Sequence, residues 1–514
     1  MTLNLAVLLE ESAEERPEKP ALILKDRVLD YAGLRNAAKR FANALVSLGV
    51  KPGDKVAVMV PNVPEFVVAY YGILNAGAAV VPLNVLLQGP EVAYHLDDSD
   101  AVALVAWEGV LEAAWKGFEG AEGCENLVVV EQPGGKGALE GAHGFDGLLG
   151  DHPAEFDMAQ TMPDDTAVVI YTSGTTGRPK GAELSHFNLF FNAVYKADKL
   201  LKLREDDVGM AVLPLFHIFG QTTVMNASIY KGNTIAMVPR FEPEAALGAI
   251  QDFGVTAFVG VPTMYQYLLR HPNADDYDTS SLRLGISGGA SMPVEVLKNF
   301  EEKFGVVILE GYGLSETSPG TCFNRSAEQR KVGSIGLPFW GIEVKVFDEN
   351  DAEVPRGERG ELVVRGHNVM KGYYKRPDAT AEAMKNGWFH TGDIAKMDED
   401  GYFYIVDRVK DMIIRGGYNV YPREVEEVLY EHPGVAEVAV VGAPHEELGE
   451  EVTAVVAMKE GESATEEEIV SFAKERVAAY KYPRRVVFME ELPKNATGKI
   501  LKRELARIGD ETRA

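Results

Sequence analysis

Cysteine is scarce in this chain: Cys124 and Cys322 are the only two among 514 residues. Their wide separation gives neither the close spacing of a metal site nor a disulfide framework. Such usage is typical of a reducing compartment, so we expect a cytoplasmic protein. Hydrophobic residues make up 46% of the chain and charged residues 25%, which is the composition of an ordinary soluble globular protein.

Net positive charge is also lacking. The formal charge of −27 argues against a general nucleic-acid-binding protein, because such proteins need a basic face. The longest apolar stretch, 66–87, is interrupted by polar residues, glycine and proline, so it predicts a helix, a turn and a buried strand rather than a membrane span. The N-terminus turns acidic too soon for a secretory signal. We expect no transmembrane segment; transient contact with a membrane surface stays open, as does the choice between monomer and homodimer.

The length of the chain exceeds what one core can fill and predicts two or three domains. A helix is expected between Asp30, as its N-cap, and Gly49, as its stop. The first 160 residues otherwise carry no recognisable chemistry, and the glycine-rich stretch 134–150 is expected to be a surface loop. Short apolar runs that alternate with helical segments predict an α/β architecture with buried sheets, its first strands at 55–60, 79–81, 101–106 and 126–130.

A Walker A loop is absent. Instead, an apolar strand at 166–171 runs into Tyr-Thr-Ser-Gly-Thr-Thr-Gly-Arg-Pro-Lys-Gly, in which Lys180 is followed by Gly181 rather than by Ser or Thr. The glycines allow positive φ and close approach of backbone amides, while the hydroxyls and the lysine are donors for phosphate oxygens. The loop therefore predicts polyphosphate binding. A plain flexible turn between a strand and a helix is the alternative.

Two further stretches, 286–293 and 309–317, are small-residue turns that each follow a short apolar strand. Small residues permit close approach to a flat ring, and Tyr312 offers a face for stacking. Glu316 is a lone acid in an otherwise neutral turn, which suits either a Mg²⁺ ligand or a surface carboxylate.

Each of the other titratable residues, taken alone, can be explained without a functional role. His217, among apolar neighbours, is as consistent with a satisfied core histidine as with a substrate contact. Asp393 follows Thr-Gly and is a common type of turn former. Lys499, near the C-terminus, would alone be read as a solvated lysine.

Together, in their order and spacing, these motifs resemble the signatures of the adenylate-forming superfamily, which contains acyl-CoA synthetases, luciferases and the adenylation domains of peptide synthetases. The resemblance covers nearly the whole chain. The details Gly-Gly-Ala-Ser-Met-Pro, Gly-Tyr-Gly-Leu-Ser-Glu and Gly-Gly-Tyr-Asn-Val-Tyr-Pro-Arg-Glu are similar to bacterial long-chain fatty acid CoA ligases. Ser315 departs from the threonine of many relatives but keeps the hydroxyl. The sequence ends soon after Lys499, so no carrier domain is expected.

The resemblance implies roles for individual residues. Lys499, Thr172 and Glu316 would be catalytic, Thr172 and Glu316 would hold Mg²⁺, and Lys410 would be the hinge. For ATP and AMP it implies Thr172, Ser173, Gly174, Thr175, Thr176, Gly177, Lys180, Gly289, Ala290, Glu310, Gly311, Tyr312, Ser315, Asp393 and Arg408. For the acyl pocket it implies His217, Ile218, Phe219 and Thr223, with Gly416, Gly417, Tyr418 and Asn419 giving access to CoA.

The implied fold class is α/β. Residues 1–409 would form a large domain of stacked α/β sheets with a distorted β-barrel part, and residues 410–514 a small mobile α+β domain. From the residues themselves we expect in the latter a helix at 422–432, strands at 435–442 and 451–458, and a second helix capped by Thr465 and Glu468.

The implied activity is that of an ATP-dependent acyl-CoA synthetase, using ATP, Mg²⁺ and CoA. A fatty acid of medium to long chain would be converted to an acyl-adenylate and then to a thioester, with release of pyrophosphate and AMP. A CoA ligase for an aromatic or other carboxylic acid is one alternative, and a luciferase-like adenylate-forming enzyme is another. A non-catalytic nucleotide-binding protein is disfavoured because Lys499 and Glu316 are both present.

Overall fold

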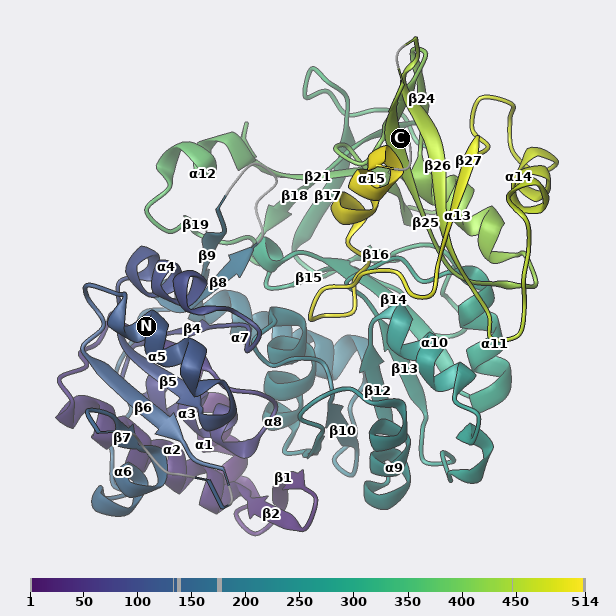
Figure 1. Cartoon of the computed structure of the whole chain (residues 1–514). Helices are drawn as coiled ribbons and strands as arrows, with labels where there is room; N and C mark the ends of the chain where they lie inside the picture. Colours follow the sequence, from purple (N-terminus) through teal and green to yellow (C-terminus); the bar gives the residue numbers. More distant parts are fainter. Residues whose placement is uncertain (1, 133, 136–139, 173–177, 446, 512–514) are drawn as a thin grey trace.

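The computed structural model describes residues 2–132, 134–135, 140–172, 178–445 and 447–511. A large α/β part carries a smaller C-terminal part on top of it (Figure 1). The α-helices are α1 Val7–Glu15, α2 Tyr31–Ser47, α3 Pro64–Asn75, α4 Gly89–Ser99, α5 Leu111–Glu119, α6 Phe145–Asp151, α7 His186–Tyr195, α8 Ala227–Lys231, α9 Pro243–Phe253, α10 Pro262–Arg270, α11 Val294–Phe304, α12 Pro377–Ala383, α13 Pro422–Tyr430, α14 Glu466–Lys474 and α15 Lys502–Glu511. Short 3₁₀ turns are η1 Glu108–Val110, η4 Ala274–Asp276 and η5 Ser315–Thr317, and π-helical turns are η2 Lys196–Leu200 and η3 Gly220–Asn226.

Two mainly parallel sheets form the large part, and the helices between their strands cover them. Parallel strands require such crossovers, which is why these strands read as continuous apolar runs in the sequence. The first sheet has the order β16 Leu337–Pro338, β15 Gly320–Phe323, β14 Val307–Gly313, β13 Leu284–Ser287, β12 Ala257–Gly260, β10 Val208–Ala211, β11 Thr234–Met237, β1 Pro20–Leu24 and β2 Arg27–Asp30. The second has the order β19 Gly372–Tyr373, β9 Lys180–Ser185, β8 Thr166–Thr172, β4 Ala79–Pro82, β3 Lys55–Met59, β5 Ala101–Trp107, β6 Asn126–Val130 and β7 His143–Gly144.

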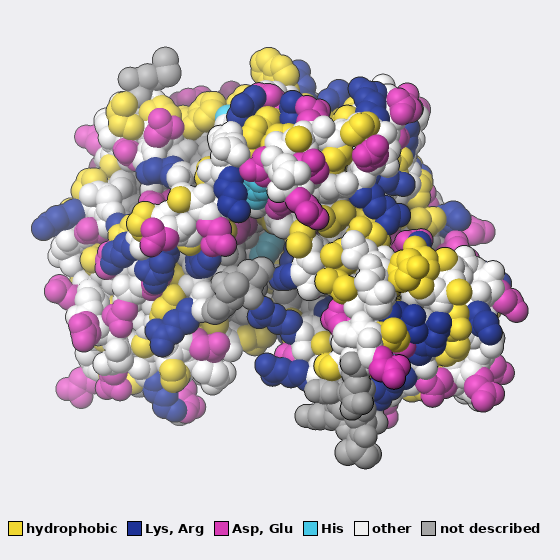
Figure 2. All heavy atoms as spheres, turned by 90° about the horizontal axis from the view of Figure 1, so that it is seen from above, with side chains coloured by type: hydrophobic (Ala, Val, Ile, Leu, Met, Phe, Trp, Pro, Cys, Tyr) yellow, Lys and Arg dark blue, Asp and Glu magenta, His cyan; other side chains and the backbone are white. Residues whose placement is uncertain are grey.

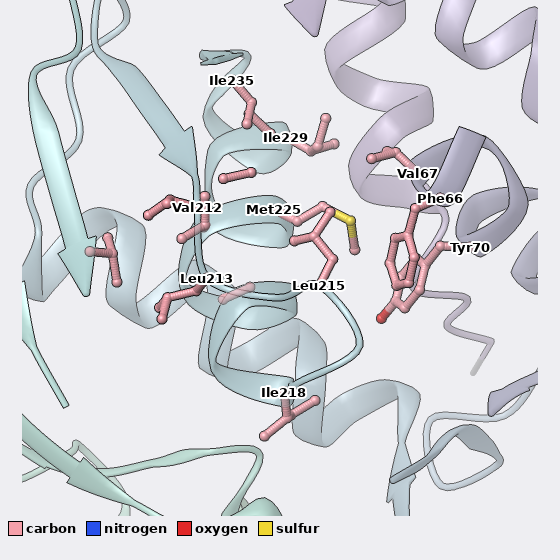
Figure 3. Close-up of a cluster of buried hydrophobic side chains, with 14 of the residues drawn as sticks. Phe66, Val67, Tyr70, Val212, Leu213, Leu215, Ile218, Met225, Ile229 and Ile235 are labelled. Atoms are coloured by element: carbon pink, nitrogen blue, oxygen red, sulfur yellow. The ribbon is translucent and has the colours of Figure 1, made fainter. Parts of the chain in front are cut away.

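Helix α3 lies in the core of the large part. All its residues are buried, because it is apolar on every face rather than amphipathic. In Figure 3 its side chains Phe66, Val67 and Tyr70 face Leu215 and Met225 from the chain between β10 and α8. The stretch 66–87 is thus a helix, a turn and a buried strand, as predicted. No helix among the described residues combines the length and the apolar character needed to cross a membrane.

Two mainly antiparallel sheets complete the chain. One has the order β17 Ile342–Phe347, β18 Arg359–Gly366, β21 Trp388–Met397 and β20 Met384–Lys385, with β22 Phe403–Arg408 beside β21; it is the half-barrel part of the fold. The other has the order β24 Tyr418–Val420, β23 Ile413–Arg415, β26 Gly449–Met458 and β25 Val435–His445, with β27 Arg485–Met489 parallel to β26. The α/β class with a small α+β unit is confirmed. We propose the break between the two parts at 409/410, where β22 has ended and β23 has not begun.

The predictions for single stretches of the sequence differ in their outcome. The side chain of Asp30 caps α2 by accepting from the Gly33 amide (2.7 Å), as expected. The stretch 309–317 is not simply a turn, since β14 continues to Gly313 by pairing with β15. The stretch 134–150 is not simply a surface loop either: where it is described it includes β7 and α6, and α6 begins at the fully buried Phe145.

Candidate active site

One cavity of about 1610 Å³ lies where the large and small parts meet. Figure 2 shows this face of the molecule hollowed near its centre, with Lys and Arg side chains along the hollow and His side chains deep inside. Of the residues expected at the site, its walls include Thr172, Lys180, His217, Phe219, Thr223, Gly289, Gly311, Tyr312, Ser315, Glu316, Asp393, Arg408, Lys410 and Lys499. Residues as far apart in the sequence as Thr172 and Lys499 therefore share one space.

The predicted phosphate loop joins two antiparallel strands, not a strand and a helix. Thr172 at the end of β8 pairs with Lys180 at the start of β9, which fixes both ends of the loop at the cavity. The five residues Ser173, Gly174, Thr175, Thr176 and Gly177 lie outside the described residues. The far arm is held by Tyr94 of α4, whose hydroxyl donates to the Pro179 carbonyl (2.7 Å).

Glu316 lies beside the lysine of this loop. Lys180 Nζ is 5.3 Å from the ring centre of Tyr373, and the Tyr373 hydroxyl donates to Glu316 Oε1 (2.9 Å). Strands β8 and β9 both pack on η5, which carries Glu316. The sequence did not single out Tyr373, since a tyrosine in a Gly-Tyr-Tyr run has no distinguishing pattern.

A tyrosine, an aspartate and an arginine meet on the opposite wall. Asp393 on β21 is directly opposite Arg408 on β22, and their side chains form an ion pair (Nε to Oδ1, 3.1 Å). The Tyr312 hydroxyl donates to the other carboxylate oxygen of Asp393 (2.5 Å). Burial, followed by the charge of Asp393, raises the pKa of Tyr312 well above its ordinary value, so the hydroxyl stays a donor. The ring is thereby fixed at the cavity wall.

Glycine is required in the strand that carries Tyr312. A Cβ atom at Gly313 would lie 1.6 Å from the carbonyl oxygen of Pro319, and one at Gly311 would lie 2.5 Å from the ring of Phe323. Neither neighbour can move easily, because both belong to the adjoining chain 319–323. Side chains at these positions would displace Tyr312.

A tight turn presents Lys499 to the cavity. The Gly498 amide donates to the Asn495 carbonyl (2.9 Å), and Thr263 at the start of α10 donates to the Gly498 carbonyl (3.0 Å). The turn is therefore fastened to the large part. Burial, followed by the cation of Arg408, lowers the pKa of Lys499 to about 8. Near neutral pH the lysine is still mainly an ammonium ion aimed into a hollow.

Asn495 positions that lysine. Its side-chain Oδ1 accepts from the amides of Thr497 (3.0 Å) and Lys499 (2.9 Å). Asn495→Ala should leave these amides without that acceptor and misplace Lys499, which should lower the rate of adenylate formation about 10- to 100-fold. Asn495→Asp keeps the acceptor and should stay close to wild type. Pyrophosphate release measured for both variants tests this, and an aspartate as damaging as alanine would contradict it.

His217 is a neutral imidazole on the cavity wall. Burial, followed by the charge of Lys499, lowers the pKa of His217 to about 4. Its Nδ1 accepts from the Phe219 amide (3.2 Å), so the proton is assigned to Nε2, which remains as a donor.

Several expected residues do not line the cavity. Ile218 is fully buried in the large core, and Ala290 is exposed. The Glu310 carboxylate accepts from the Met292 amide (3.3 Å), and burial raises its pKa to about 7. Tyr94 and neighbouring polar residues of α4 also line the cavity, so the first 160 residues contribute to its wall.

The expected CoA-access segment lies away from the cavity. Gly416 and Gly417 form the two-residue turn between β23 and β24, with φ of +56° and +84°. Tyr418 is 60% exposed and stacks on Tyr480 with ring centres 4.9 Å apart. Neither the glycines, Tyr418 nor Asn419 lines the cavity. In this structure Lys499 therefore lies at the cavity and this turn does not.

Comparison with known proteins identifies this arrangement. The family model described as AMP-binding enzyme matches residues 9–374, and the model described as AMP-binding enzyme C-terminal domain matches residues 424–499. The chain belongs to the AMP-binding enzyme family. The adenylate-forming superfamily inferred from the sequence motifs is therefore confirmed.

Three relatives indicate the type of reaction. A long-chain-fatty-acid–CoA ligase of Bacillus subtilis (strain 168) is 39% identical, with 98% of this chain and 94% of the relative covered. A feruloyl-CoA synthase of an Amycolatopsis species is also 39% identical, with 96% and 97% covered. The crystal structure of an anthranilate CoA ligase in complex with anthranoyl-AMP has a TM-score of 0.93 at 31% identity, with 99% and 98% covered. Family and relatives support an AMP-forming acid–CoA ligase, while the acids of the relatives differ.

Proposed function

We propose that this AMP-binding enzyme activates a carboxylic acid with ATP and transfers the acyl group to CoA. The observation that carries the proposal is the convergence of Lys499, the Tyr312–Asp393–Arg408 cluster and the ends of the phosphate loop on one cavity. The lysine would bind the acid group, the aromatic face would stack on the adenine, and the carboxylate–arginine pair would bind the ribose.

The first half-reaction joins a carboxylate oxygen of the acid to the α-phosphorus of ATP and breaks the bond to the β-phosphate, so pyrophosphate leaves. Negative charge grows on the α-phosphate oxygens, and the ammonium of Lys499 would stabilise it. The Asp393 carboxylate would accept from the ribose hydroxyls, steadied by Arg408. The Nε2–H of His217 would donate to the carboxylate of the acid and orient it. In the second half-reaction the CoA sulfur attacks the acyl carbon and AMP leaves.

Magnesium fits the residues around Glu316. Among the described residues no group of three His, Cys, Asp or Glu side chains could hold a metal by itself. Mg²⁺ commonly binds one or two protein oxygens and completes its shell with phosphates and water. Glu316 and Thr172 both line the cavity and would supply those oxygens. The ion would neutralise phosphate charge when ATP is bound.

Glu316→Gln tests this role. Glutamine keeps the shape and can still accept from Tyr373, but it removes the negative charge. Half-maximal pyrophosphate release should then require about ten times more Mg²⁺. Tyr373→Phe is the matched control, since it removes the hydrogen bond and leaves the carboxylate, and its Mg²⁺ requirement should change much less. A Mg²⁺ titration that is the same for Glu316→Gln and wild type would count against the assignment.

For the acid, we propose a fatty acid of medium to long chain. The sequence motifs and the relative from Bacillus subtilis support it, and a cavity of about 1610 Å³ exceeds what the nucleotide alone would fill. An aromatic acid is the second candidate. Phe219, Phe323 and Phe339 line the cavity, and the feruloyl-CoA synthase is as similar as the fatty acid ligase.

A panel of carboxylic acids from C2 to C18, together with aromatic acids, tests both candidates. Each acid is supplied with ATP, Mg²⁺ and CoA, and AMP release and thioester are measured. We expect AMP and thioester in equal amounts for the preferred acid. A luciferase-like enzyme would instead consume oxygen with an adenylated substrate, which oxygen uptake measures. If no acid yields AMP, the proposed function is wrong.

A further inference from the structure

Lys196 is a buried lysine that none of the steps above uses. It begins η2 directly after α7, and its side chain is 5% exposed. Its ammonium donates to the hydroxyl of Thr223 in η3 (2.8 Å), and both side chains line the cavity. Both residues therefore lie in π-helical turns, which are rare and frequent at functional sites.

The ammonium of Lys196 has no ionic partner within the described residues. The Thr223 hydroxyl takes up one of its three donors. Burial lowers the pKa of Lys196 to about 7, with no nearby charge contributing. An unpaired buried cation is costly, and a lysine is retained in such a place most readily when a ligand completes it.

Lys196 differs from Lys499 in its surroundings. Arg408 and Asp393 contribute to the pKa of Lys499, whereas burial alone lowers the pKa of Lys196. Neighbouring residues enclose the Lys196 side chain tightly. A Cβ atom at Gly320 would lie 2.9 Å from Lys196 Cε and 2.4 Å from the Phe339 ring, so the lysine stem is packed beneath the chain there.

The wall around Thr223 closes this part of the cavity. Leu201, Thr223 and Ile286 line the main cavity on one side and a separate void of about 10 Å³ on the other, which is no larger than a water site. Ser287, next to Ile286, also lines the main cavity, and its buried hydroxyl has no hydrogen-bond partner among the described residues. Lys196 and Ser287 therefore both bring buried polar groups to the wall of the main cavity.

We propose that Lys196, together with Thr223, binds an oxygen at the end of the substrate acid remote from the carboxylate that is activated. The oxygen is a hydroxyl, a phenol oxygen or a second carboxylate. The inference rests on the proposed function, because it assigns the part of the cavity around Lys196 and Thr223 to the acid. It narrows the substrate class to oxygenated acids. A plain alkyl end would leave the ammonium desolvated and unpaired.

Lys196→Met tests the proposal with matched pairs of acids. The pairs are dodecanoic acid with 12-hydroxydodecanoic and dodecanedioic acids, and cinnamic acid with 4-hydroxycinnamic acid. Wild type should show the higher kcat/KM for the oxygenated member of at least one pair, by about 10- to 100-fold, as for a hydrogen bond to a charged group. Lys196→Met, which keeps the length and removes the charge, should abolish or reverse that ratio. Thr223→Val should reduce it less.

The readouts separate this proposal from a structural role and from the proposed function. Removing an unpaired buried charge should leave the Tm of Lys196→Met unchanged or raise it, whereas loss of a structural strut would lower it. If wild type has equal kcat/KM for both members of every pair, the role of Lys196 is wrong, but the proposed function still stands. The same conclusion follows if the kcat/KM ratio of a pair is the same in Lys196→Met as in wild type. No pyrophosphate with any acid would overturn the proposed function itself.

Discussion

Lys499→Ala should lose acyl-adenylate formation while still converting supplied acyl-adenylate to thioester. The ammonium of Lys499 is half-buried at the cavity, close enough to Arg408 and Asp393 to be influenced by both. Removing one charge aimed at a developing anion typically lowers the rate about 100-fold or more. Once the adenylate exists, that anion no longer has to form. Pyrophosphate release and thioester formation, assayed separately, test this, and equal loss of both would refute the assignment.

The pH dependence of the first half-reaction supplies a second test of the same residue. Burial lowers the pKa of Lys499 to about 8, and only the protonated form can stabilise the phosphate. The value of kcat/KM for ATP should therefore fall as the pH rises through about 8. Lys499→Arg keeps its charge at much higher pH, so it should retain more activity than alanine and lose this alkaline limb. A limb that persists in Lys499→Arg belongs to another group.

Much of the fold follows from local rules that the sequence shows directly. Asp30 caps α2, Thr465 and Glu468 form the capping box of α14, and buried parallel strands appear as apolar runs. These features depend on residues within one or two turns of each other. Thr172, Gly289 and Ser315 of the cavity wall could be found in the same way, because each lies at or just after the end of a strand, β8, β13 and β14 respectively.

Residues whose position depends on distant partners could not be predicted. Tyr373 is significant only because strand pairing brings it between Lys180 and Glu316. Lys196 looks like any lysine after an apolar helix, and its burial arises from Gly320 and Phe339, over a hundred residues later. Neighbours that are distant in the sequence determine whether such a side chain is buried at the cavity, so its role cannot be inferred from the local sequence.

The two expected small-domain elements occupy different places in this structure. Lys499 lines the cavity, and Thr263 and Tyr267 of α10 hold its segment through Gly498 (3.0 Å) and Lys494 (2.8 Å). The turn at Gly416–Gly417 is outside the cavity. We propose that this arrangement serves adenylate formation. Thiol transfer would require the small part to rotate, so that these α10 contacts break and the other turn enters.

We propose residue 410 as the hinge of such a rotation. β22 ends at Arg408 and β23 begins at Ile413; between them the Val409 amide donates to the Gly392 carbonyl (3.0 Å), whereas within the described residues the amide of Lys410 donates to nothing. Lys410 is not among the residues with positive φ. A proline there would remove no observed hydrogen bond and would fix φ near about −65°, while limiting the backbone of Val409 as well. Proline would also strain the turn in which the Asp411 amide donates to the Arg408 carbonyl (3.1 Å), but the substitution should impair the change to another arrangement more than it impairs the present one.

Lys410→Pro should accordingly form acyl-adenylate at a near-normal rate and transfer it to CoA poorly, by about 100-fold, since a hinge residue must absorb a large change in φ and ψ. Lys410 also lines the cavity, so loss of its side chain has to be separated from loss of its rotation. Lys410→Ala does this, because alanine removes the ammonium and leaves the backbone free; it should preserve thioester formation far better than proline. Each half-reaction is measured separately for both variants. If alanine and proline impair transfer equally, the side chain rather than the rotation explains the defect, and the hinge must be sought elsewhere.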